Sequence, residues 1–313
     1  MSTVQQAPLP MMPEALPPAN PRRIAWARRS RAVKGYWRTF RRSGQGMTGL
    51  SILTFFFLLA IFAPLLVDEN QIQVASATGL PYEHPNLQHL LGTDKFGRDV
   101  LAMLIYGSRI SLLVGITAAL GAMFLGGIVG LWAGYFGGKT DGFLNAVTNW
   151  FLVIPWIPLA IILVSLLGRN LLNIILVLAI TSWAGTARIV RAQALSVKER
   201  TYVERSQALG ASNTHMISRH ILPNVFPVLF ANLVLLISLS ILSETTLSIL
   251  GLGDPNSISW GTMIGESFEE GALTAGIWWW LIPPGVCLVM VTLSFTMCGY
   301  ALDDILNPRL RER

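Results

Sequence analysis

Six long stretches of the chain are almost free of charged residues. They cover residues 49–67, 110–136, 143–167, 171–187, 225–252 and 272–302. Most of them reach the roughly 20 residues that an α-helix needs to cross the hydrocarbon core of a bilayer, and the fourth is the shortest. Glu244 is the single charged residue within them. A soluble core of this size would not be so depleted of charge, so the pattern predicts an all-α polytopic membrane protein with six transmembrane helices.

The composition of the chain supports this prediction. Hydrophobic residues make up 52% of it and charged residues 13%, against roughly 25% charged residues in a typical soluble domain. Cys287 and Cys298 stand eleven residues apart, about 16 Å along a helix, whereas a disulfide needs Cα atoms within about 7 Å. The four histidines show no metal-ligand spacing. We therefore expect no disulfide, metal or cofactor in this chain.

The distribution of Lys and Arg predicts the orientation of the helices. Residues 1–46, Lys139, the segment 188–224 and the C-terminal arginines hold 19 of these residues. The remaining four, Lys95, Arg98, Arg109 and Arg169, fall on the other side. The positive-inside rule then places both the N- and the C-terminus in the cytoplasm. The net charge of +6 is thus explained by topology, and no nucleic-acid partner is expected.

Four regions follow from this topology. Residues 1–35, rich in proline and arginine, predict a disordered cytoplasmic tail. In residues 36–46, aromatic side chains alternate with arginines, which indicates either an amphipathic helix in the headgroup layer or a basic flank that only sets topology. Residues 47–305 form the six-helix domain, with an external loop at 68–109, a cytoplasmic loop at 188–224 and a second external loop at 253–275. Residues 306–313 form a cytoplasmic tail.

A glycine-rich stretch at 133–140 matches the loose pattern of a phosphate-binding loop. We do not expect it to bind ATP, because a membrane helix and not a strand precedes it. Gly126, Gly130 and Gly134 recur every four residues, so one helix face is flat and admits a close neighbour. Gly137 and Gly138 are expected to end that helix.

The cytoplasmic loop contains a spaced pattern of Glu204, Gly210 and Pro223. It predicts a helix, a glycine break that permits a positive φ, a short second helix and a proline that opens the fifth span. A short helix held at the membrane surface can dock a soluble partner around residues 206–216. It can then transmit rigid-body motion to the spans.

This loop resembles the EAA motif of permease subunits in bacterial ABC importers. Glu204, Gly210, Leu222 and Pro223 match the motif. Arg205 and Ser206 replace its two alanines, and His220 replaces its isoleucine. The resemblance implies that the contact with an ATPase is made by Glu204, Ser206, Ala208, Leu209, Gly210, Ala211, Ser212 and Pro223.

Further segments resemble the C-type permeases of dipeptide and oligopeptide importers. They lie at 89–101, 106–115, 134–138, 247–253, 260–263 and 306–310, and the resemblance covers about residues 36–310. It implies a type I ABC importer permease fold in the bacterial inner membrane, without catalytic residues. The implied partners are a homologous B-type permease, two ABC ATPases that hold ATP and Mg, an extracytoplasmic binding protein, the peptide and membrane lipid. Nickel and glutathione importers share this family, so those solutes remain alternatives.

Several polar residues carry open alternatives. Glu244 either lines the transport path, pairs with neighbours such as Ser243 and Thr245 or with the partner permease, or binds a proton. In the first external loop, Asp94, Arg98 and Asp99 form either a local charge network or a receptor contact. In the second, the acidic set Asp254, Glu266, Glu269 and Glu270 is either solvated or contacts a binding protein.

Prolines and tryptophans support two further expectations. Trp278, Trp279 and Trp280 are expected to anchor the chain in an external aromatic belt. Pro155 and Pro158 are expected to kink the third span. The sixth span is expected to start after Pro283 and Pro284 or to hold them in its first turn.

A rival interpretation is a secondary transporter or channel. It would need intramembrane ion-coupling groups or an inverted repeat, and Glu244 alone is available.

Overall fold

The computed structural model describes residues 34–306, so the predicted N-terminal tail and the C-terminal tail lie almost wholly outside the described residues. A short helix at 34–40 comes first. Thirteen elements follow: α2 (Gly44–Leu66), η1 (Glu69–Gln71), η2 (Val74–Ser76), α3 (Val100–Phe136), α4 (Gly138–Val153), α5 (Trp156–Leu167), α6 (Leu171–Lys198), α7 (Thr201–Ala208), α8 (Asn213–His215), a π-helical turn η3 (Met216–Ile221), α9 (Leu222–Ile249), α10 (Trp260–Glu269) and α11 (Trp278–Leu306). Residues 34–306 contain no β-strand, only an isolated bridge between Thr93 and Asp99.

Five helical segments are long and apolar enough to cross a membrane, and the α4–α5 pair makes six if it is one bent span. This confirms the predicted all-α polytopic fold. The third span is broken, because α4 and α5 meet at 91°. Ile154 is extended, as the residue before a proline prefers. Pro158 falls in the first turn of α5, where a missing N–H costs no helical hydrogen bond.

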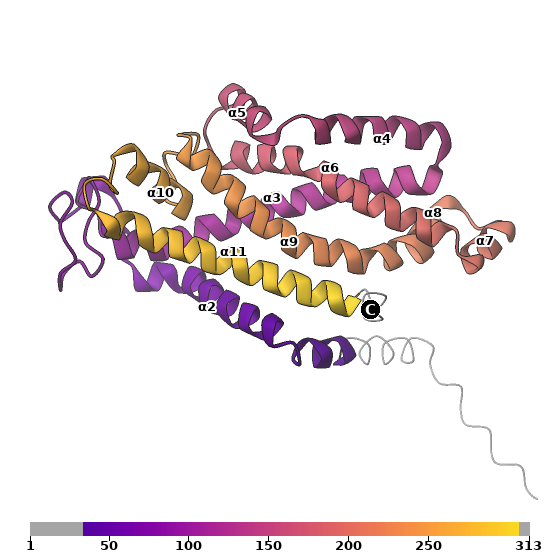
Figure 1. Ribbon diagram of the computed structural model, residues 1–313, viewed down its shortest axis with the longest axis horizontal. Helices are drawn as coiled ribbons and strands as arrows, with labels where there is room; N and C mark the ends of the chain where they lie inside the picture. Colours follow the sequence, from indigo (N-terminus) through magenta and orange to yellow (C-terminus); the bar gives the residue numbers. More distant parts are fainter. Residues whose placement is uncertain (1–33, 307–313) are drawn as a thin grey trace, which may run out of the picture.

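The long helices lie side by side and place the connections at two ends of the bundle (Figure 1). One end, here the α10 end, carries residues 67–99 and α10. The other, the α7 end, carries the start of α2, the α3–α4 junction, α7 and the end of α11. Both ends of the described chain therefore lie at the α7 end, as the predicted topology requires.

The closest packing in the bundle joins α3 to α6 along the predicted glycine face. A Cβ atom built on Gly126 would lie 2.4 Å from the carbonyl oxygen of Trp183, and one on Gly130 would lie 2.5 Å from that of Ala187. A Cβ atom on Gly134 would lie 2.7 Å from the Cβ of Ala194. The prediction of a flat helix face against a close neighbour is thus confirmed.

The structure corrects three boundaries. Helix α3 begins at Val100, inside the predicted loop 68–109, because the side chain of Asp99 caps it. Helix α6 extends to Lys198, inside the predicted loop 188–224, and α9 begins at Leu222, so the segment between these two helices is shorter than predicted. The loop 253–275 contains α10.

A fourth correction concerns the sixth span. Helix α11 begins at Trp278, so Pro283 and Pro284 lie in its second turn, neither before the helix nor in its first turn. The preceding segment, predicted as the start of the span, forms turns over residues 270–276.

Candidate functional site

Helix α7 protrudes at one end of the bundle and is anchored by a small apolar cluster (Figure 1). Val203 of α7, with Met216 and Ile221 of η3, is buried in this cluster. There they meet Val190, Ala194 and Val197 of α6, Leu131 and Tyr135 of α3 and the start of α9. Helix α7 is therefore anchored to the bundle through a cluster that three of the long helices share.

Gly210 ends α7 in a left-handed conformation, with φ of +85°. The N–H of Ala211 donates to the carbonyl of Ser206 at 3.2 Å, and the N–H of Gly210 donates to that of Gln207 at 2.9 Å. These two bonds define a Schellman motif, in which a residue other than glycine is strained. The predicted glycine break is confirmed, and the side chain of Ser212 then caps α8.

Polar contacts fix the same segment to the bundle. The Tyr135 hydroxyl donates to Oδ1 of Asn213 at 2.7 Å, and the Lys198 ammonium donates to the carbonyl of Tyr135 at 2.6 Å. The end of α3 is thereby joined to the end of α6 and to α8. Ser206 Oγ lies 3.3 Å from Nε2 of His220. No sequence pattern assigned a structural role to Tyr135, Lys198 or Asn213, because contacts between distant segments leave no periodic signal.

The motif residues are all exposed or half-buried. Leu209 is 89% exposed. Glu204, Ala208, Gly210, Ser212 and Pro223 are also exposed, and Ser206 and Ala211 are half-buried. Met216 is fully buried, so the expectation that the docking surface extends to residue 216 is wrong, since the apolar cluster covers this side chain.

Pro223 lies in the first turn of α9, as predicted. The second helix of the loop is not separate from the span, however. It continues from Asn213 through the π-helical turn to Ile249. A π-helical turn next to a proline is a common way for a continuous helix to accommodate a missing N–H.

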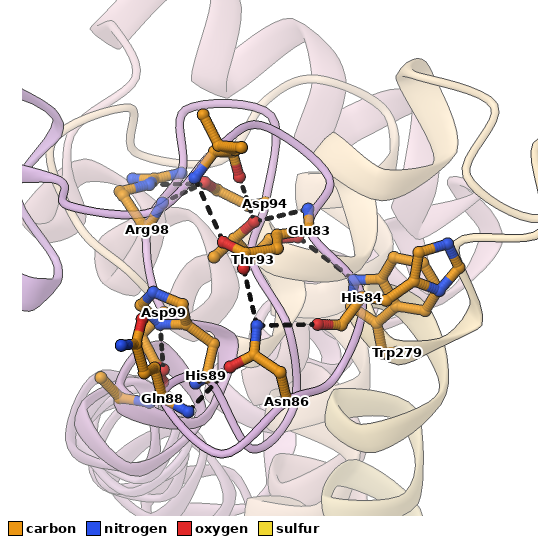
Figure 2. Close-up of polar contacts among 12 residues, drawn as sticks. Glu83, His84, Asn86, Gln88, His89, Thr93, Asp94, Arg98, Asp99 and Trp279 are labelled. Atoms are coloured by element: carbon orange, nitrogen blue, oxygen red, sulfur yellow. Dashed lines mark hydrogen bonds and ion pairs between the residues drawn. The ribbon is translucent and has the colours of Figure 1, made fainter.

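At the α10 end, Arg98 is the centre of a charge network (Figure 2). Its Nε donates to Oδ2 of the fully buried Asp94 at 2.6 Å. Its terminal nitrogen donates to Oε2 of Glu266 on α10 at 3.1 Å. Asp94 Oδ1 also accepts the N–H groups of Phe96 and Arg98. Of the two alternatives for Asp94 and Arg98, the local charge network is present.

Asp99 belongs to a second set of contacts. Its Oδ1 accepts the N–H of Ala102 at 2.8 Å and so caps α3, and its Oδ2 lies 2.9 Å from Nδ1 of His89 (Figure 2). Asp99 is therefore the N-cap residue of a spanning helix. This capping role explains why a carboxylate stands directly before Val100.

The acidic residues of the second loop have unequal surroundings. Glu266 is partly buried, and burial raises its pKa while the neighbouring Arg98 and Lys95 oppose that rise. Glu270 pairs with Lys95 at 3.1 Å. Glu269 is exposed. Asp254 is buried and accepts the hydroxyl of Ser257 at 2.7 Å. Of the two alternatives for this acidic set, a solvated loop therefore holds only in part, because Asp254 and Glu266 are not freely exposed.

The three tryptophans do not form a belt. Trp279 and Trp280 are buried, whereas Trp278 is half-exposed. The indole N–H of Trp279 donates to the carbonyl of Thr93 at 3.2 Å, and Trp279 lies beside the loop, next to His84 (Figure 2). The anchoring prediction is thus wrong for two of the three, because they form the core that supports the first loop.

Glu244 lies buried between α9 and α10. Its Oε1 accepts hydroxyl groups from Ser259 at 2.7 Å and from Ser248 at 3.0 Å. Its Oε2 has no hydrogen-bond partner among the described residues and faces Gly261, where a Cβ atom would lie 2.6 Å away. The side chain therefore joins two helices within this chain, which agrees with the alternative of pairing with nearby hydroxyl groups, although Ser248 and Ser259 take the place of Ser243.

The long apolar helices, with a short helix anchored at one end of the bundle, define a polytopic membrane protein. Comparison with known proteins identifies the family. Residues 126–312 match the model of the binding-protein-dependent transport system inner membrane component, and residues 33–85 match the N-terminal TM domain of oligopeptide transport permease C. The chain belongs to this family of binding-protein-dependent transport permeases, and is a multi-pass protein of the inner membrane.

Individual relatives support the assignment. The dipeptide transport system permease protein DppC of Bacillus subtilis is 36% identical over 88% of this chain and 85% of its own. The oligopeptide permease OppC of the same organism is 35% identical over 87% and 88%. The glutathione permease GsiD of Pectobacterium atrosepticum is 31% identical over 88% and 91%. An inward-facing structure of the MetNI methionine ABC transporter shares the fold, with a TM-score of 0.52 and 19% identity over 67% of this chain and 97% of that one.

Proposed function

We propose that this chain is one of two permeases of an ATP-driven importer of dipeptides or oligopeptides. A homologous second permease would complete the path, and an extracytoplasmic binding protein would deliver the peptide. Two ATPase subunits, which hold ATP and Mg, would dock at α7. The identity to dipeptide and oligopeptide permeases over most of the chain supports the peptide. Glutathione, itself a peptide, is the second candidate, because a glutathione permease is 31% identical.

The observation that carries the coupling role is the construction of α7. It offers an exposed tip at Leu209 and Gly210, whereas its inner face is buried through Val203 in an apolar cluster that also holds residues of α3, α6 and α9. A partner that moves the tip would therefore act on the ends of these three spanning helices. Nucleotide would act only by shifting the balance between two states of this bundle, which requires different affinity for each state.

Substitution of Gly210 tests this role. A Cβ atom at Gly210 meets no atom within 4 Å, so Gly210→Val changes the backbone conformation without a steric clash. A left-handed β-branched residue costs at least about 1–2 kcal/mol, whereas asparagine tolerates this conformation. We expect Gly210→Val to reduce peptide uptake and the ATPase stimulation caused by the binding protein. Gly210→Asn should retain much more of the uptake and of the stimulation than Gly210→Val does.

Gly185→Ala on α6 is the matched control, because that glycine is also free of neighbours and lacks a positive φ. It should leave uptake unchanged. Full uptake in Gly210→Val would contradict the coupling role. Gradient-driven uptake by vesicles that hold this chain alone would instead support the rival, a secondary transporter or channel.

A further inference from the structure

An apolar groove of about 590 Å³ opens at the α7 end of the bundle, between the start of α2, the first half of α9 and the last half of α11. Its floor includes Leu53 and Phe295, which are buried. Its rim includes Trp37, Phe226 and Phe230, which are about half-exposed. The lining is apolar almost throughout, so water gains few hydrogen bonds there and the groove favours an apolar occupant.

The length of the groove matches one leaflet of a bilayer. Along α11 it extends from Phe295 to Leu306, eleven residues or about 16 Å. Half the hydrocarbon core of a bilayer is about 15 Å thick. A single extended acyl chain suits this length.

Exposed arginines adjoin the lining residues of the groove in the sequence. Arg38, Arg41 and Arg42 are exposed and alternate in sequence with Trp37 and Phe40, which line it. Among the described residues none of these arginines forms an ion pair. The sequence from 22 to 67 contains no acidic residue.

Two carboxylates, Asp303 and Asp304, stand on α11 between the lining residues Leu302 and Ile305. They offset only part of the charge of Arg38, Arg41, Arg42 and Lys34. The rim therefore remains cationic and suits an anionic phosphate group.

We propose that this groove binds an anionic phospholipid, with one acyl chain between α9 and α11 and its phosphate against Arg38, Arg41 and Arg42. This site is independent of what the permease transports. It also gives the segment 36–46 a specific task, because the bound lipid would join this segment to α9 and α11.

Photo-crosslinking tests the proposal. The full chain is reconstituted in phosphatidylcholine vesicles with a small fraction of phosphatidylglycerol that carries a diazirine in its acyl chain. We expect mass spectrometry to find adducts on the peptides that contain Phe226–Val234 and Phe295–Leu306. A phosphatidylcholine probe with the same acyl chain should label these peptides several-fold less.

The charge variant combines Arg38→Gln, Arg41→Gln and Arg42→Gln. Each basic residue near a membrane surface is worth about fivefold in binding, so labelling by phosphatidylglycerol should fall at least about tenfold. The matched control removes three arginines earlier in the same basic segment, Arg28→Gln, Arg29→Gln and Arg31→Gln, and should retain labelling.

Two further measurements keep the test decisive if the charge variant misfolds. With the unaltered chain, labelling by phosphatidylglycerol should weaken as salt rises, because the attraction is screened. Val234→Trp, which fills the groove from α9, should reduce labelling by both probes. Equal labelling by the two probes, an equal loss in the control variant, or crosslinks from the groove to residues 1–33 or to another protein would overturn the proposal.

Discussion

Replacement of Gly130 by alanine tests the packing on which the bundle depends. The new methyl group would lie 2.5 Å from the carbonyl oxygen of Ala187 and 2.7 Å from the Cβ of Val190, closer than such atoms approach in proteins. These two atoms are part of the α6 backbone or bonded directly to it, and they cannot move aside as a flexible side chain would. Helices α3 and α6 must therefore separate. Overpacking of this kind costs about 1–3 kcal/mol, and the better helix propensity of alanine returns at most about 1 kcal/mol.

Gly127→Ala is the matched control, in the same helix and three residues away. Its methyl group would lie 3.6 Å from Leu229, an ordinary contact, so this variant should be as stable as the wild type or slightly more stable. The assay is the fraction of detergent-solubilised chain that stays monodisperse after heating. The monodisperse fraction of Gly130→Ala should fall at a lower temperature than that of the wild type. If both variants behave alike, the argument from close α3–α6 contact is wrong.

Three further predictions concern the polar contacts at the α10 end. Arg98→Ala leaves the fully buried Asp94 without its charge partner, so it should destabilise the chain by about 3–5 kcal/mol. The measurement is denaturation in mixed micelles, and an effect below about 1 kcal/mol would contradict a stabilising role of the buried pair. The raised pKa of Glu266 means that its charged form is disfavoured on folding, so its contribution to stability is lost as pH rises through that pKa. Glu266→Gln should therefore gain stability over the wild type near neutral pH, and the gain should shrink in acid. Glu244→Gln keeps an acceptor for Ser248 and Ser259, so Glu244→Leu should cost about 1–3 kcal/mol more than Glu244→Gln in the same denaturation assay.

The two ends of the bundle suit different tasks. At the α10 end, Arg98, Asp94 and Glu266 fix the first loop to α10, so a binding protein would meet a surface that is already ordered. At the α7 end, only Val203 of α7 is buried, and most of its surface remains free. A separate motor protein needs such a protruding element to exert force on the spans.

Much of this arrangement follows from the sequence alone. Long stretches without charge must become helices in a bilayer, so the number of spans is fixed by solvation and not by packing. Glycines spaced by four predict a close helix contact, because they share one face. Gly210 in its motif predicts a helix end, because a positive φ suits glycine. These features are local, and the physics that decides them acts within a few residues.

The tertiary structure decided the rest. The 91° break at Pro155, the burial of Trp279 and Trp280, and the serine partners of Glu244 depend on which segments meet in space. A tryptophan near the end of a span has the same sequence context whether it faces lipid or supports a loop. Hydrophobicity alone cannot separate the two environments, because both are apolar, and only the packing of α10 and residues 68–99 against α11 distinguishes them.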